Sequence, residues 1–164
     1  MKSVLVVLAA SIICCLYSNS FAQTLPETQS WIKNVIENYP HVSSESYSEY
    51  EVAFPDKCQM VVNGRTQIPE LNMDMLYRFS IPIENMLQIH FQEKSHSITM
   101  FFRVKPEGRQ IDMIFFGTSY SGKKDSVELL MTKGLNQDNL KTRIIRAFNH
   151  YIELCGGSVL DDTF

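Results

Sequence analysis

Short segments rich in aromatic and β-branched residues alternate with turn-forming residues through the middle of the chain. This pattern predicts seven β-strands, near residues 50–54, 58–62, 75–81, 87–91, 98–104, 110–117 and 127–132. The breaks between the strands carry turn chemistry, for example at Asn63-Gly64 and Ser121-Gly122. A parallel pair of strands needs a crossover of about a dozen residues or more, and most of these connections are shorter. The strands are therefore expected to form an antiparallel meander.

Amphipathic helices are predicted on both sides of this strand region. The first is expected to start at a capping box, Thr24 to Glu27, and to stop at Pro40. The second is expected to run from Asn136 to a left-handed stop at Gly156-Gly157. Their apolar faces hold Trp31, Ile32, Val35, Ile36 and Tyr39 in the first helix, and Leu140, Ile144, Ile145, Phe148, Tyr151, Ile152 and Cys155 in the second. The predicted fold class is α+β: an antiparallel sheet or roll of about seven short strands, with an N-terminal helix and a closing C-terminal helix.

Two of the predicted strands, 98–104 and 110–117, are apolar on both alternating faces over part of their length. One face of each strand is expected to pack against a second layer. The other face is either sheltered by a helix or forms an open apolar groove. A two-layer core is the simpler expectation, and the groove is the alternative.

The first residues have the features of a secretory signal peptide. Lys2 is followed by an apolar run from Val4 to Leu16, and Ala22 ends a short stretch of small and polar residues. A retained anchor is the alternative, although a membrane span needs about 20 apolar residues. The expected location is periplasmic or secreted, with no membrane span after cleavage. The expected boundaries are a signal peptide at 1–22, a single α+β domain at 23–157 and a flexible C-terminal tail at 158–164.

The charge of the exported chain argues against two classes of partner. Cleavage after Ala22 leaves 14 basic and 18 acidic side chains, which is a formal charge of −4. Proteins that bind nucleic acid or an anionic membrane electrostatically usually carry a basic stripe. No nucleic-acid partner is therefore expected.

Two cysteines, Cys58 and Cys155, remain after cleavage. An even pair in an exported domain predicts a disulfide, whereas one cysteine beside a histidine would act as a nucleophile. A helix packed across the strand that Cys58 opens could bring the two α-carbons within the roughly 4.4 to 6.8 Å that a disulfide needs. The two cysteines are therefore the disulfide candidate.

The motifs that resemble catalytic loops are incomplete. The segment 117–123 has the spacing Gly-x4-Gly-Lys of a phosphate-binding loop, but Lys124 stands where a Ser or Thr would bind magnesium. Ser119 lacks the second glycine of a nucleophile elbow. The segment is therefore predicted to be a hairpin turn, and no catalytic or cofactor-binding residue is assigned.

The histidines do not form a recognisable metal site. His41 and His150 are expected to be exposed, whereas His90 and His96 flank a predicted turn and could face each other across a hairpin. A catalytic zinc usually has three protein ligands, so two histidines are too few. No metal ligand and no cofactor are predicted.

Charged side chains offer one candidate interaction surface. Arg143, Arg146 and His150 share part of the predicted C-terminal helix, and this surface either receives an acidic partner or keeps the helix soluble. Glu45 and the nearby pair Glu49 and Glu51 lie in a polar stretch and are expected to be solvated.

The order of the predicted elements, strands closed by a C-terminal helix, resembles a pleckstrin-homology-like roll. The first hairpin, Phe54 to Lys57, has one lysine and one aspartate where the lipid-binding members of that fold have several basic residues. The resemblance therefore does not imply phosphoinositide binding. The segments 77–86 and 143–157 resemble a group of uncharacterised exported proteins of Bacteroidetes-type bacteria. That resemblance implies an extracytoplasmic bacterial setting and no particular activity.

The predicted function is that of an exported, non-catalytic binding or interaction module for an unknown protein or small ligand. The alternative is a small extracytoplasmic hydrolase with a dispersed site, because carboxylate pairs from distant strands leave no motif. A shallow apolar groove or an exposed strand edge would favour binding. A deep pocket with convergent titratable side chains would favour the enzyme.

Overall fold

The computed structural model describes residues 23–158, so the predicted signal peptide at 1–22 and residues 159–164 of the predicted tail lie outside the described residues. In the sequence of this part, one α-helix precedes the strands and one follows them: α2 (Leu25–Asn38) and α3 (Leu140–Leu154). The strands are β1 (Tyr47–Asp56), β2 (Gln59–Ile68), β3 (Met73–Pro82), β4 (Met86–Glu93), β5 (Ile98–Val104), β6 (Ile111–Phe116), β7 (Ser121–Lys124) and β8 (Ser126–Met131). Short 3₁₀ helices are η1 (Pro69–Leu71), η2 (Ile83–Asn85) and η3 (Lys133–Asn139). The α+β class is thus as predicted.

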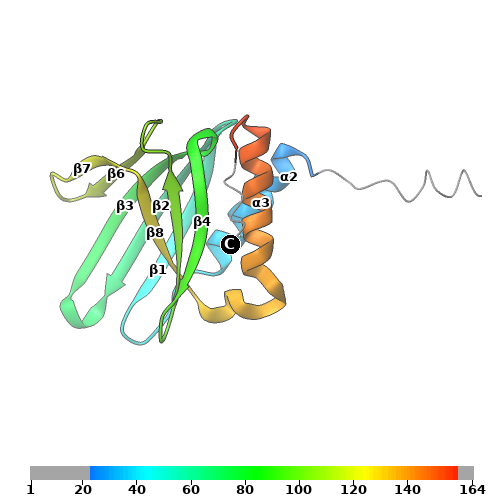
Figure 1. Ribbon diagram of the computed structural model, residues 1–164. Helices are drawn as coiled ribbons and strands as arrows, with labels where there is room; N and C mark the ends of the chain where they lie inside the picture. Colours follow the sequence, from blue (N-terminus) through cyan, green and yellow to red (C-terminus); the bar gives the residue numbers. More distant parts are fainter. Residues whose placement is uncertain (1–22, 159–164) are drawn as a thin grey trace, which may run out of the picture.

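The strands form two antiparallel sheets (Figure 1). The larger sheet has the order β1-β2-β3-β6-β7 and the smaller one has the order β4-β5-β8. The expected meander therefore holds only from β1 to β3. After β3, the turn at Pro82 and η2 takes the chain out of the larger sheet, and β6 later returns to pair with β3.

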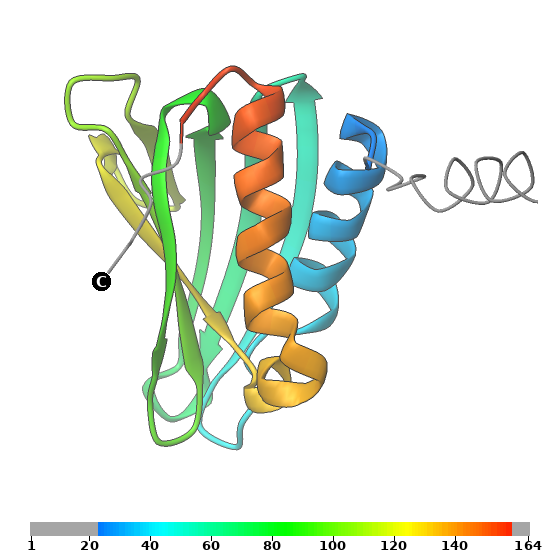
Figure 2. The same cartoon turned by 45° about the vertical axis from the view of Figure 1, so that its right-hand side comes forward.

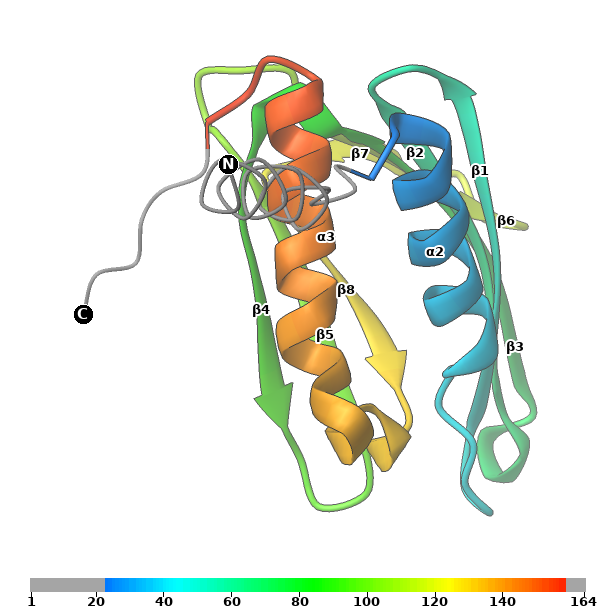
Figure 3. The same ribbon diagram turned by 90° about the vertical axis from the view of Figure 1, so that its right-hand side faces the viewer.

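The two helices cover one side of the molecule. Viewed from that side, α3 and α2 stand next to each other in front of the sheets, with β4 at the outer side of α3, β8 visible between the two helices and β1 at the outer side of α2 (Figure 3). The intermediate view shows the same arrangement along the length of α3 (Figure 2). The buried face of α2 (Ile32, Val35 and Ile36) and the buried face of α3 join the inner faces of both sheets in a common core.

The helix ends were mostly predicted correctly from local sequence signals. The N–H of Thr24 donates to the Glu27 carboxylate at 2.8 Å, as expected of a capping box. At the end of α3, Gly156 has a φ of +78°, and the N–H groups of Gly156 and Gly157 donate to the carbonyl oxygens of Glu153 and Ile152, both at 2.9 Å. This is the Schellman stop that two consecutive glycines predict.

The predicted start of the second helix at Asn136 is wrong by four residues. Asp138 and Asn139 have positive φ values of 51° and 55°, which interrupt the helical path. The chain therefore forms η3 first, and α3 begins at Leu140. Asparagine and aspartate tolerate this backbone region better than most residues.

Two turn predictions also need correction. Ser121-Gly122 lies inside β7, which pairs with β6 at the edge of the larger sheet. Asn63-Gly64 lies in the middle of β2, opposite Arg78 and Tyr77 of β3. A Cβ atom on Gly64 would lie 2.2 Å from Cε2 of Tyr77. Glycine is needed at position 64 because an aromatic ring lies over the backbone there, not because the chain turns.

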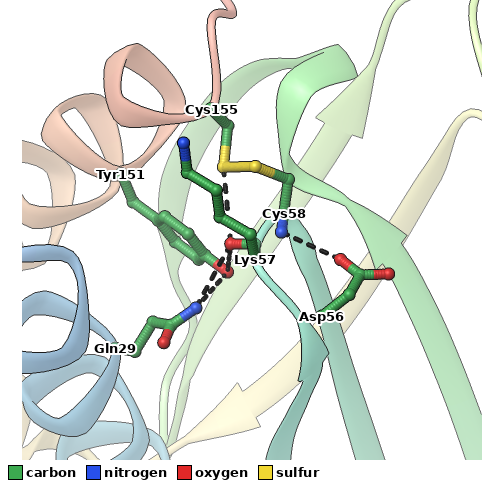
Figure 4. The surroundings of a disulfide bond; sticks show 6 residues. All are labelled: Gln29, Asp56, Lys57, Cys58, Tyr151 and Cys155. Carbon is green, nitrogen blue, oxygen red and sulfur yellow. Dashed lines mark hydrogen bonds between the residues drawn. A yellow bond between two sulfur atoms is a disulfide. The ribbon is translucent and has the colours of Figure 1, made fainter.

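The disulfide between Cys58 and Cys155 is present, as predicted. Its α-carbons are 5.5 Å apart, and the bond connects residues separated by 97 positions. Figure 4 shows the carbonyl group of Lys57 beside this bond, between α2 and α3. The Tyr151 hydroxyl donates to the Lys57 carbonyl oxygen at 3.1 Å and accepts from Gln29 Nε2 at 2.9 Å. Burial raises the pKa of Tyr151 to about 12, so this hydroxyl stays a donor.

Within residues 23–158, no helix has both the length and the apolar character needed to cross a membrane.

Candidate functional site

A groove runs between the two sheets, which we call the inter-sheet groove. Its volume is about 600 Å³, within the range of ligand-binding clefts. One side is the inner face of the larger sheet and the other is β8, the edge strand of the smaller sheet. The lining residues are Thr66, Met75, Tyr77, Phe79, Lys94, Met113, Phe115, Lys124, Ser126, Val127, Glu128 and Leu130.

The floor of the groove is aromatic and apolar. Tyr77 and Phe79 stack with ring centroids 4.9 Å apart, and Phe115 lies 5.9 Å from Tyr77. In the β3–β6 ladder Tyr77 pairs with Phe115, and Phe79 pairs with Met113. Because alternate residues of a strand point to the same face, these four side chains lie together on the inner face of the sheet. The groove that was the alternative expectation for strand 110–117 is thus present.

A chain of hydroxyl groups fixes the ring of Tyr77. Its hydroxyl lies 3.3 Å from Thr66 Oγ1, which in turn lies 3.2 Å from Ser48 Oγ. Gly64 leaves the space that the ring occupies. The floor is therefore held in place by its own sheet before any ligand arrives.

The wall of the groove is an open strand edge. The Tyr50 hydroxyl donates to the Leu130 carbonyl oxygen at 3.0 Å and accepts from the Leu130 N–H at 2.9 Å, so the backbone groups of Leu130 point away from β5. Backbone direction alternates along an antiparallel strand, so those of Glu128 and Ser126 point the same way. In the described part of the chain the outward N–H and C=O groups of Ser126 and Glu128 have no partner.

The ends of the groove are positively charged. Lys124 stands just before β8, and Lys94 lies in the β4–β5 hairpin, near the other end of β8, because Ile98 pairs with Met131. Among the described residues neither lysine forms an ion pair. Glu128 is the acidic residue of the lining. The groove thus combines an apolar middle with an excess of positive charge.

The structure places Arg143, Arg146 and His150 at the seam between the two helices. The Arg143 guanidinium lies 5.4 Å from the ring centroid of Trp31 on α2, and His150 Nε2 lies 2.8 Å from the carbonyl oxygen of Gln23. Arg146 lines a depression of about 200 Å³ together with Trp31 and Gln23. Two of the three side chains therefore contact residues of the domain itself. Their role as a partner surface stays a prediction.

The prediction that His41 is exposed is wrong, because this residue is 5 % exposed. Its backbone connects two strands: the His41 N–H donates to the Leu130 carbonyl oxygen at 3.1 Å, and its own carbonyl oxygen accepts from the Ser48 N–H at 2.8 Å. Burial, and to a smaller extent the nearby His96, lowers the pKa of His41.

The remaining motif residues lie apart from the groove floor. Across the β4–β5 hairpin His90 pairs with Phe101, and not with His96, and its ring stacks on Phe101 with centroids 4.6 Å apart. Within residues 23–158, no three His, Cys, Asp or Glu side chains are grouped so that they could hold a metal. Within the segment 117–123, residues 117–120 form the hairpin connection from β6 to β7, and residues 121–123 already belong to β7. Glu45, Glu49 and Glu51 are exposed, as expected.

Comparison with family models, with curated proteins and with solved structures finds no match to this chain.

Proposed function

We propose that the protein is an exported, non-catalytic binding module whose ligand site is the inter-sheet groove. One observation carries the proposal: a fixed aromatic floor lies beside a strand edge whose backbone groups have no partner among the described residues. Buried apolar surface stabilises a complex, and free backbone donors and acceptors orient the ligand.

The lining of the groove supports binding more than hydrolysis. In the described part of the chain its titratable side chains are two lysines, one glutamate and Tyr77, with no histidine or cysteine. A nucleophile or a general base needs a partner within hydrogen-bond reach, and the hydroxyl of Tyr77 is directed to Thr66. The dispersed hydrolase remains the alternative, and none of the described residues that line the groove favours it.

Export to the periplasm or the cell exterior belongs to the same proposal. It is supported by the basic and apolar start of the chain and by the disulfide, because disulfides persist in oxidising compartments. The resemblances to a pleckstrin-homology-like roll and to exported proteins of Bacteroidetes-type bacteria stay predictions.

The proposal is tested with 8-anilinonaphthalene-1-sulfonate, an apolar fluorophore that carries one negative charge. We expect its fluorescence to rise on titration with the purified, disulfide-bonded protein. Phe115→Ala should weaken this binding at least about fivefold, because the floor loses a large apolar side chain.

The matched control is Phe116→Ala. Phe116 is the next residue of β6, points to the opposite face and is 48 % exposed. This variant should bind the dye as the original protein does, with an unchanged circular dichroism spectrum in both variants. Equal losses in the two variants, or no binding at all, would show that the groove is not the ligand site.

A further inference from the structure

We propose that the ligand of the inter-sheet groove is an extended peptide segment of a partner protein, which pairs with β8 as a fourth strand of the smaller sheet. The inference rests on the proposed function of the groove as the ligand site. It adds the class of ligand, its conformation and its charge.

The backbone of β8 provides the first argument. β8 pairs with β5 on one side, and on its other side the end of the strand is bridged by Pro40, which pairs with Met131. The N–H and C=O groups of Ser126 and Glu128 point to this other side and have no partner among the described residues. An apolar small molecule that covered them would remove their water without replacing its hydrogen bonds, which is unfavourable. An extended peptide about 4.8 Å away would satisfy them as a ladder.

The length of the paired segment is limited by Tyr50. The Tyr50 hydroxyl is hydrogen-bonded to both the N–H and the C=O of Leu130, and the His41 N–H also donates to the Leu130 carbonyl oxygen. Leu130 therefore has no backbone group left for a peptide. Strand addition is thus restricted to the first half of β8, from the crossover after Lys124 to Glu128. This region has room for a peptide of about five residues at roughly 3.3 Å per residue.

The floor determines which side chains of the peptide are apolar. A strand placed beside β8 lies over Tyr77, Phe79 and Phe115 of the larger sheet. Its residues i and i+2 would point to this floor, and the residue between them would point to solvent. An alternating apolar and polar segment therefore fits the groove.

The charges at the ends determine the flanking residues. Lys124 and Lys94 lie near opposite ends of β8 and make no ion pair in the described part of the chain. Acidic residues on either side of the apolar pair would meet one lysine each. Because these charges lie near the surface, the affinity should fall as salt concentration rises.

The test is selection from a phage-displayed library of random heptapeptides on the purified protein. We expect enriched sequences with apolar residues at i and i+2 and an acidic residue on at least one side. Binding of the enriched peptide should be lost in Phe115→Ala and kept in Phe116→Ala. Enrichment of sequences without alternation would overturn the proposal.

Backbone pairing is tested first on the unchanged protein with modified peptides, a test in which no variant has to fold. N-methylation of a peptide amide that faces β8 should weaken binding about tenfold, because one backbone hydrogen bond is lost and a methyl group enters the ladder. The same change at a neighbouring amide that faces away should have little effect. Glu128→Pro should weaken binding of the peptide in the same way, because the variant lacks the N–H of residue 128. The variant should still fold, because an edge strand tolerates proline where the N–H does not pair.

The dye titration separates the two proposals. If Phe115→Ala weakens the dye while both N-methylated peptides bind equally, the groove is a ligand site and strand addition is wrong. If neither dye nor any peptide binds, both proposals fail. If sedimentation instead shows dimers that Glu128→Pro dissociates, the occupant is a second copy of this chain, and the partner-peptide proposal is overturned.

Discussion

At the scale of single residues, Gly64 and Tyr77 depend on each other. The ring of Tyr77 fills the space where any other residue at position 64 would place its Cβ atom, 2.2 Å from Cε2 of that ring. Tyr77 lies in the floor of the inter-sheet groove, so a change in β2 is expected to alter the groove.

Gly64→Ala should lower the free energy of unfolding by about 1 to 3 kcal/mol, because the added methyl group overpacks a buried contact. The displaced ring should also weaken dye binding in the groove. Urea denaturation and the fluorescence titration measure the two effects. Gly122→Ala is the control, since a Cβ atom there meets nothing within 4 Å. Equal stability of the two variants would contradict the role of Gly64.

His41 is expected to make stability depend on pH. Burial lowers the pKa of His41 in the folded protein below its ordinary value of 6.5, so the unfolded chain binds more protons as the pH falls through 6.5. The free energy of unfolding should therefore decrease from pH 7 to pH 5. In His41→Gln this decrease should become smaller, as measured by urea denaturation at several pH values. An identical pH dependence in both proteins would show that His41 does not carry the effect.

At the scale of secondary structure elements, α3 closes the core through its apolar face. Phe148 is fully buried, and its ring packs edge to face against Phe102 of β5 with centroids 5.5 Å apart. Phe148→Ala should lower the free energy of unfolding by about 3 to 5 kcal/mol, because it leaves a cavity between α3 and the sheet. Arg146→Ala, on the exposed face of the same helix, should change it by less than about 0.5 kcal/mol. A small loss in Phe148→Ala would mean that α3 does not anchor the sheet as the structure indicates.

Elements with local signals were predicted well, and elements that depend on distant partners were not. The stop of α3 is set by Gly156 and Gly157 themselves, and strand β5 matches the predicted range 98–104. The short strand β7 has two lysines and little apolar character, and it exists because β6 offers it a partner. The local sequence predicts a turn at Gly64, because the contact of Gly64 with Tyr77 joins two strands whose register the sequence does not show.

At the scale of the whole molecule, the inter-sheet groove depends on strand order. The apolar residues of 110–117 indicate that one face of this strand is either covered or open. They do not show where the strand predicted at 127–132 lies in space relative to that face. Only the pairing of β3 with β6, and the departure of β4 and β5 into a second sheet, places Phe115 below the open edge of β8. Such pairings join residues far apart in the chain, so a periodic pattern within one segment does not encode them.

The disulfide acts on this same scale, because it ties the hairpin between β1 and β2 to the end of the last helix. Its loop of 97 residues restricts the unfolded chain strongly, and the chain-entropy model gives a stabilisation of roughly 4 to 5 kcal/mol as an upper value.

The double variant Cys58→Ser with Cys155→Ser should lose a large part of this stabilisation, as measured by urea denaturation without reductant. The original protein with added reductant is the control and should approach the variant, because both lack the cross-link. The contacts among Tyr151, Gln29 and Lys57 hold the β1–β2 hairpin, α3 and also α2 together without the sulfur atoms. The variant should therefore still fold and bind the dye in the groove. Equal stability with and without the bond would mean that these contacts, and not the disulfide, fasten α3 to the sheet.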